Sequence, residues 1–279
     1  MLERFLVLKP ALISAIASTS DIAVEFSNGD WKLMWQIEET LKTFKKATLQ
    51  LSKASASISQ VIPLVTYIIR KLKVDKEHDH GIKTFKRQLQ TAMEDRFASL
   101  EDHEHFYVAT LLDPRYKGYF FLKSHTLERA KFFVSTKLKE RIESELVVTE
   151  EMDQTDHGQS EIDKEMSQMV QASMAQHSSE NEVNGFLEDY CKSNIIKNNN
   201  PLDFWKSKSS SMKMIDRLAS NLAAHYLTPP ATSVDVERLF STAGDILTPE
   251  RNRLCPETAE KVLFLRENLP IVGFQFYTR

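Results

Sequence analysis

Two pairs of histidines are the residues whose type and spacing could bind a metal ion. His78 and His80 form one pair, and His103 and His105 form the other. Side chains two positions apart on a helix point in different directions, and a zinc site needs three or four ligands in one place. Neither cysteine lies near these pairs in the sequence. We therefore interpret both pairs as solvated helix ends, and we expect no metal site and no cofactor.

Aromatic and basic residues could instead contact nucleic acid, because bases stack on tryptophan rings and lysines neutralise phosphates. The tryptophans are Trp31, Trp35 and Trp205, but tryptophan at helical spacing usually belongs to a hydrophobic core. A local basic cluster consists of Lys71, Lys73, Lys83, Lys86 and Arg87. Solvation of a helix surface explains this cluster, and a formal charge of −3 gives the chain no general attraction to nucleic acid.

The composition of the 279 residues indicates long helices in an intracellular protein. Seven glycines and nine prolines are few for this length, whereas all-β folds use more of both in turns. Two cysteines, Cys191 and Cys255, suit a reducing compartment and exclude a disulfide framework. We find no zinc-finger spacing and no apolar stretch long enough to span a bilayer, and Lys9 and Pro10 interrupt the N-terminal apolar run before it resembles a signal peptide.

Hydrophobic periodicity predicts helices along most of the chain, because apolar residues recur at alternating spacings of three and four. We expect Pro10 to kink or divide the first helix, and the turn signal Asp113-Pro114-Arg115 to end an apolar segment. A short terminal strand at 274–277 is the one strand we predict. The predicted helical or apolar segments are 1–16, 31–51, 55–72, 82–97, 105–112, 127–148, 183–196, 202–208 and 212–226.

Segment 149–182 has a different composition from its neighbours. It holds nine acidic residues and one lysine, and it is rich in serine and glutamine. Such a segment has too little apolar surface to offset the entropy of ordering, so we predict a disordered linker with a short helix at 162–174 as its one ordered piece. The predicted organisation is a helical region at 1–148, the acidic linker at 149–182 and a C-terminal region at 183–279.

The most strongly specified stretch is 229–269, where the sequence predicts two short helices. Thr232-Ser-Val-Asp235 fits a helix start signal, Gly244 is expected to stop the first helix, Pro256 to begin the second and Pro270 to end it. The two apolar stripes comprise Val236, Leu239, Phe240 and Ala243, and Ala259, Val262, Leu263, Leu265 and Leu269.

Two such helices cannot bury both faces against each other alone, so they need the rest of the chain or a second subunit. From the pattern by itself, an ordinary hairpin packed on its own core is the favoured interpretation.

Several segments resemble the hAT transposase superfamily, including the domesticated proteins that carry BED-type zinc fingers. The similarity is dense in ATSVDVERLFSTAGDIL (231–247) and RNRLCPETAEKVLFLRENL (251–269), which resemble its C-terminal dimerisation region. It continues upstream through NPLDFWKS (200–207) and the predicted helical residues 218–226, and it reappears more weakly in ATLLDPRYK (109–117) and MLERFLVLKPAL (1–12). The resemblance implies a mostly α fold, in which the helical insertion and the C-terminal helices of an RNase-H-like transposase remain and the sheet is largely missing.

By the same resemblance, Glu237 stands at the third acidic position of an RNase-H-like site. Such sites use clustered carboxylates to hold two divalent metal ions for phosphoryl transfer. The resemblance places the other two acidic residues on the sheet and implies that this chain begins inside the insertion, without the sheet or the BED finger. We therefore expect no enzyme activity, and we interpret Glu237 as a surface carboxylate paired with Arg238 or Arg251.

Protein dimerisation is the function that the resemblance favours. We expect a homodimer, or a heterodimer with a related hAT-derived protein, in the nucleus, with weak nucleic-acid binding and no membrane association. Two alternatives stay open: an active transposase or nuclease, if a longer isoform supplies the two aspartates, and a transposon fragment without a function. The pattern does not decide which apolar side chains face the monomer interior, and Phe240 is our example of a core residue. The candidate dimerisation residues are Val236, Leu239, Phe240, Val262, Leu263, Leu265 and Leu269.

Overall fold

The computed structural model describes residues 1–18, 26–74, 80–150, 166, 179–197, 200–247 and 254–274, without the side chains of 80, 146–150 and 245. Within these residues the chain is helical, and the β-type pairing is one isolated antiparallel bridge between Ser57 and Pro230. The prediction of a mostly α fold is confirmed. The strand expected at 274–277 lies outside the described residues except for Phe274, which is in irregular structure. No described helix is long and apolar enough to cross a membrane.

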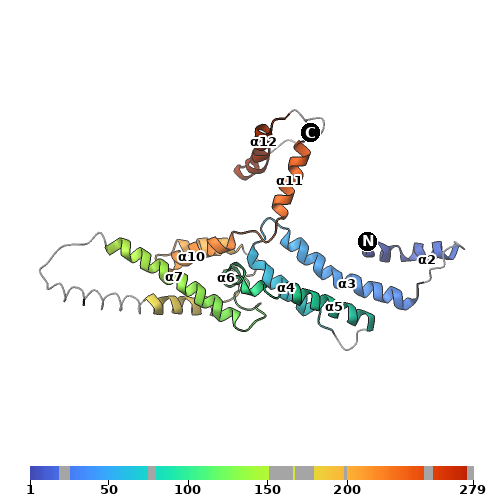
Figure 1. Cartoon of the computed structure of the whole chain (residues 1–279), viewed down its shortest axis with the longest axis horizontal. Coiled ribbons are helices and arrows are strands. Elements are labelled where there is room, and N and C mark those ends of the chain that lie inside the picture. The colour runs from blue at the N-terminus through green and yellow to red at the C-terminus, as the bar shows by residue number, and fades with distance from the viewer. Residues whose placement is uncertain are drawn as a thin grey trace.

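Figure 1 shows the order of the helices along the chain. In the first half they are α1 (Leu2–Val7), α2 (Lys9–Ser18), α3 (Asn28–Leu51), η1 (Ile58–Gln60), α4 (Val61–Lys71), α5 (His80–Arg96), η2 (Leu100–Asp102), α6 (Glu104–Leu112) and α7 (Thr126–Glu150). In the second half, helical residues 179–192 precede α9 (Pro201–Ser209), α10 (Met214–Leu227), α11 (Val234–Ile246), α12 (Pro256–Asn268) and η4 (Leu269–Val272).

Local capping explains why α3 begins three residues before the start predicted from its apolar stripe. The Ser27 hydroxyl accepts a hydrogen bond from the Asp30 amide (3.1 Å), and the Asp30 carboxylate accepts one from the Ser27 amide (2.8 Å). This capping box satisfies two backbone donors that the helix itself leaves free. Pro10 occupies the second position of α2, where its missing N–H costs nothing, so the predicted boundary at this residue is confirmed.

The centre of the fold is the short helix α6, which lies between α7 and α10 on one side and α4 on the other (Figure 1). Every residue from Tyr107 to Leu112 is buried. A helix that is apolar all round needs neighbours on all sides. We call these neighbours the α6 bundle: α6 with η1, α7, residues 179–192, α9 and α10, which share one buried apolar cluster.

Side chains from distant segments close the carboxyl end of α6. Trp205 donates its indole N–H to the Leu112 carbonyl (2.8 Å), and Tyr190 donates its hydroxyl to the Leu111 carbonyl (3.1 Å). The buried Asp113 carboxylate follows, accepting hydrogen bonds from Ser59 (2.6 Å) and from the Arg115 guanidinium. The bonds from Trp205 and Tyr190 satisfy carbonyls at the end of α6 that the helix leaves unpaired.

Residues on both sides of the acidic segment build the α6 bundle, because Val134 of α7 and Leu222 of α10 belong to the same apolar cluster. At its ends, α7 continues to Glu150 and helical structure is present again from 179. Apart from Met166, which is helical, the rest of the predicted linker lies outside the described residues, so the division at 149–182 stays a prediction.

Candidate association surface

The last two α-helices form a hairpin that stands away from the remainder of the molecule (Figure 1). We call residues 234–247 and 254–274 the C-terminal arm. Its helices α11 and α12 make their main contacts with each other, and α12 also contacts η4. Of the described arm residues, only Ile246 is buried. The arm is therefore an element whose apolar surface is largely uncovered.

A short extended segment joins the arm to the bundle. The Ile58 amide donates to the Pro229 carbonyl (3.1 Å), and the Ala231 amide donates to the Ala56 carbonyl (2.9 Å). From the first turns of α11, Arg238 donates to the Ser52 carbonyl (2.8 Å). These contacts hold the beginning of α11 at the end of α3, so the root of the arm is fixed although its body is not covered.

The predicted limits of the arm helices are right for α12 and wrong in part for α11. Pro256 begins α12, and the helix ends at Asn268 with Leu269 as its C-cap residue, directly before Pro270, as expected. At the start of α11 the Thr232 hydroxyl accepts a hydrogen bond from the Val234 amide (3.4 Å), whereas the Ser233 side chain makes no capping bond. Gly244 does not stop α11, which continues to Ile246, whereas Gly273 does take a left-handed conformation (φ 84°). A Cβ added at Gly244 would meet no neighbouring atom within 4 Å, so no close packing there requires glycine or a turn.

Apolar side chains of α11 divide between two faces. Leu239, Ala243 and Ile246 are spaced at four and three residues and are half-buried or buried. Phe240 and Leu247 lie on another side, where the Phe240 side chain is 71% exposed. The first face is the one that neighbouring structure covers, and the second presents an aromatic ring and an aliphatic side chain to solvent.

Helix α12 repeats this division. Ala259 and Leu263 are half-buried, whereas Phe264 and Leu265 are exposed. A hollow of about 570 Å³ lies against the exposed side, bordered by Phe264 and Leu265 and by the charged residues Glu257, Glu260 and Lys261. An apolar floor with a charged rim is the usual anatomy of a protein–protein contact surface.

The structure separates the sequence-predicted dimerisation candidates by exposure. The prediction that Phe240 is a core residue of the monomer is wrong, because this residue is exposed. The half-buried candidates are Leu239, Leu263 and Leu269, and the exposed candidates are Val236, Phe240, Val262 and Leu265. The apolar pattern predicted these positions. It did not predict a role for Phe264, because this residue lies outside the apolar stripe of α12.

Glu237 lies in the first turn of α11, exposed to solvent. Its carboxylate accepts a hydrogen bond from the Ser233 hydroxyl (2.8 Å). The expected pair with Arg238 is wrong, because Arg238 binds the Asp235 carboxylate (3.1 Å), and Arg251 lies outside the described residues. Among the residues that the structure describes, no group of three or more His, Cys, Asp or Glu could hold a metal ion.

The histidines and tryptophans fall in different surroundings. His103 is the N-cap residue of α6, and His78 lies outside the described residues. Trp31 is buried against Phe5, with ring centroids 5.6 Å apart, and Trp205 is buried in the α6 bundle. These two tryptophans are core residues, as their helical spacing indicates.

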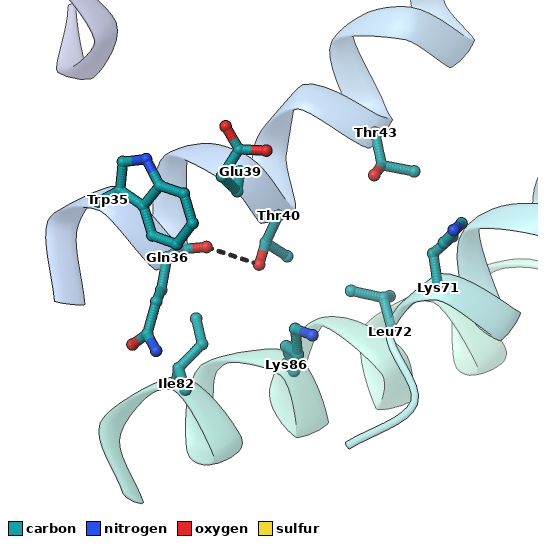
Figure 2. Close-up of a pocket in the computed structure, with 9 residues that line it drawn as sticks. All are labelled: Trp35, Gln36, Glu39, Thr40, Thr43, Lys71, Leu72, Ile82 and Lys86. Atoms are coloured by element: carbon teal, nitrogen blue, oxygen red, sulfur yellow. Dashed lines mark hydrogen bonds between the residues drawn. The ribbon is translucent and has the colours of Figure 1, made fainter. Parts of the chain in front are cut away.

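Trp35 is the exception among the tryptophans. It borders a hollow of about 260 Å³ between α3, the end of α4 and α5 (Figure 2). The other lining residues are mixed in character: Lys71 and Lys86 stand beside Leu72 and Ile82. Two residues of the basic cluster, Lys71 and Lys86, therefore border this hollow, whereas Arg87 is exposed on α5.

Sequence reasoning missed a set of buried polar residues around the α6 bundle. The Lys117 ammonium is buried and donates to the carbonyls of Tyr190 (2.7 Å) and Ser193 (2.5 Å), and burial lowers its pKa. The Glu101 carboxylate accepts from the Leu122 amide (2.6 Å) and from the Thr126 hydroxyl (2.6 Å) at the start of α7. The segment ATLLDPRYK contains Lys117, but the sequence indicated only a turn there.

Comparison with known proteins identifies relatives of this chain. The model of the hAT family C-terminal dimerisation region matches residues 186–269. The chain is 27% identical over 279 residues to zinc finger BED domain-containing protein 4 of Homo sapiens. This alignment covers 99% of the chain and 23% of that protein. It is 22% identical over 281 residues to zinc finger BED domain-containing protein 6 of Mus musculus, covering 89% of this chain and 28% of that protein.

These matches confirm the resemblance inferred from the sequence. The chain spans about a quarter of the length of the curated relatives it matches. The matched residues 186–269 include the last part of the α6 bundle, the root of the arm, α11 and α12.

Proposed function

We propose that the chain is a dimerisation module that associates through the C-terminal arm, because the model of the hAT family C-terminal dimerisation region matches residues 186–269. The observation that carries the proposal is the exposed apolar side of α11 and α12, on a hairpin with few contacts to the bundle. Association would cover the side chains that the monomer leaves in water.

The length of the arm helices supports the same conclusion. Each has 13 residues, and isolated helices shorter than about 12–15 residues are marginal in water. Their own contact buries Ile246 alone among the described arm residues. A partner that covers Phe240 and Phe264 would stabilise the hairpin, because burying a large apolar side chain contributes about 1.5–3 kcal/mol.

A second copy of the chain is the partner we propose first, and a related hAT-derived protein is the second. The test is the mass of the whole chain in solution by light scattering across a concentration series, starting from the monomer mass of 32.1 kDa. We expect twice the monomer mass at micromolar concentration. A chain that stays monomeric well above micromolar concentration, and that does not bind the matching segment of zinc finger BED domain-containing protein 4, would contradict dimerisation.

We further propose that this chain by itself does not catalyse strand cleavage or transfer. Glu237 is exposed and held by Ser233, and two-metal phosphoryl transfer needs several carboxylates around one site. The test is incubation of the purified chain with DNA and Mn²⁺. Cleavage that disappears in Glu237→Ala would overturn this proposal and revive the transposase alternative.

A nuclear, DNA-associated role is the finer part of the proposal. It rests on the relatives, whose names describe zinc finger BED domain-containing proteins. We expect the tagged chain to accumulate in nuclei together with a full-length relative and to lose that distribution when Phe240 and Phe264 are both replaced by serine. If the tagged chain were distributed evenly between nucleus and cytoplasm in the presence of the relative, this result would contradict the nuclear role.

A further inference from the structure

A groove of about 580 Å³ lies on the α6 bundle, away from the C-terminal arm, between helical residues 179–192 and the helices α9 and α10. The association proposed above does not use this groove. Its walls hold aromatic rings, carboxylates and two lysines. The lining residues are Glu182, Phe186, Asp189, Tyr190, Ser193, Phe204, Trp205, Lys208, Lys213, Ile215 and Asp216.

Aromatic rings form one connected wall of the groove. The rings of Phe186 and Tyr190 are nearly parallel (9°), with centroids 6.5 Å apart. Phe204 is inclined at 44° to Tyr190 and stands edge-on to Trp205, with centroids 6.4 Å and 5.2 Å away, respectively. Tyr190 and Trp205 are buried behind the half-buried Phe186 and Phe204. The wall therefore offers π-electron surface in more than one orientation.

The charges at the two ends of the groove differ. At one end, Lys208 in the last turn of α9 lies 3.7 Å from the carboxylate of Asp216, which is in the first turn of α10. An anion at this end would meet a carboxylate already placed at the positive end of the helix. Along the other side, Glu182 and Asp189 are exposed residues on the same helix as Phe186. Carboxylates beside aromatic rings favour a cation.

The molecule already places one cation on the same ring system. The Lys117 ammonium lies 5.0 Å from the centroid of the Tyr190 ring while it donates to the carbonyls at the end of helix 179–192. Ammonium groups are attracted to the faces of aromatic rings, and the carbonyl end of a helix adds partial negative charge. Ser193, at that helix end, also lines the groove.

From this arrangement we propose that the groove binds an organic cation, the ammonium head of a lysine side chain presented by a partner protein. Phe186 and Phe204 contact the methylene groups and the cationic head, and Asp189 and Glu182 supply the opposite charge. Methylation of that lysine strengthens binding, because a methylated ammonium is less strongly hydrated and interacts with aromatic rings at a lower desolvation cost.

The test uses the whole chain and three small probes: the N-acetyl amides of lysine, trimethyllysine and acetyllysine. Binding is followed by the NMR signals of the phenylalanine rings during titration. We expect trimethyllysine to bind most tightly and neutral acetyllysine to bind about tenfold more weakly or worse. Phe186→Leu and Asp189→Asn should each weaken trimethyllysine binding about fivefold or more.

Glu188→Gln is the matched control for Asp189→Asn. Glu188 is the preceding residue, is exposed, and pairs with Lys192 (2.7 Å) outside the groove. This variant should bind trimethyllysine like the wild type. If Phe186→Leu fails to fold, Phe204→Leu provides the second test of the rings.

Three results would overturn the proposal. Equal binding of trimethyllysine and acetyllysine would identify a simple apolar groove, and saturable binding of inorganic phosphate at the same signals would identify an anion site. Absence of any shift with trimethyllysine up to about 10 mM, a concentration that corresponds to less than about 3 kcal/mol of binding free energy, would show that no such site exists.

Discussion

The α6 bundle and the C-terminal arm both consist of helices with apolar side chains, but these side chains are buried in the bundle and largely exposed on the arm. In α6, the residues from Tyr107 to Leu112 are buried, and partners from α9 and helix 179–192 close its end. In α11 and α12, large side chains such as Phe240 and Phe264 are exposed. The bundle therefore buries its apolar side chains within one chain, whereas the arm keeps exposed apolar surface that a partner could cover.

The largest expected effect is on the stability of the bundle. Trp205→Ala should lower the free energy of unfolding by roughly 3–5 kcal/mol, because it leaves a cavity and an unpaired Leu112 carbonyl. Urea unfolding followed by circular dichroism measures this change. Trp35→Ala is the matched control, since Trp35 is 57% exposed and Trp205 is 2% exposed. Equal losses in the two variants would remove the distinction between bundle and surface.

The next effect concerns association through the arm. Phe240→Ala should raise the dissociation constant about 30-fold, which corresponds to roughly 2 kcal/mol, while the stability of the bundle is unchanged. Sedimentation equilibrium measures the constant. Phe132→Ala is the control, because Phe132 on α7 is 73% exposed and Phe240 is 71% exposed. If both substitutions act alike, the arm is not the association surface.

A smaller effect should appear in alkaline solution, and it should be confined to the bundle. Burial raises the pKa of Tyr190 well above its ordinary value of 10.0, so the neutral phenol is favoured in the folded state. This contribution is complete below about pH 10 and is lost as the pH rises from there through the folded pKa. The lowered pKa of Lys117 acts with the opposite sign, since its penalty disappears as the lysine deprotonates.

We therefore expect urea midpoints to fall as the pH rises above about 10 in the wild type and to fall less in Tyr190→Phe. Tyr119→Phe, at a tyrosine that is 57% exposed, is the control and should follow the wild type. The described arm contains no tyrosine, so its helices should not contribute to this change. A midpoint that falls equally in all three proteins would contradict the role assigned to Tyr190.

The smallest effect is expected at Glu237. Glu237→Ala removes one exposed hydrogen bond to Ser233, and surface changes of this kind stay within about 0.5 kcal/mol for stability. The same variant should dimerise like the wild type in sedimentation equilibrium. A dissociation constant raised more than about tenfold would place Glu237 inside the interface and change our view of which side of α11 is covered.

Much of the fold follows from patterns that depend only on neighbouring residues. The stripe of α12 and Pro256 predicted where that helix begins, and Pro10 predicted the division between α1 and α2. These predictions succeed because helix periodicity and proline geometry are local. Gly244 misled the prediction for α11, since a glycine permits a left-handed residue but does not require one when no contact favours a turn.

The sequence by itself determined that this chain is helical, that its last helices resemble the hAT dimerisation region and which positions on them are apolar. Only the tertiary structure decided which apolar positions are covered, because exposure depends on helices that are distant in the sequence. It placed Phe240 in solvent and Trp205 in the core, and it brought Lys117 against Tyr190 across more than seventy residues. Periodicity describes one helix at a time, whereas burial and charge pairing arise from the packing of several.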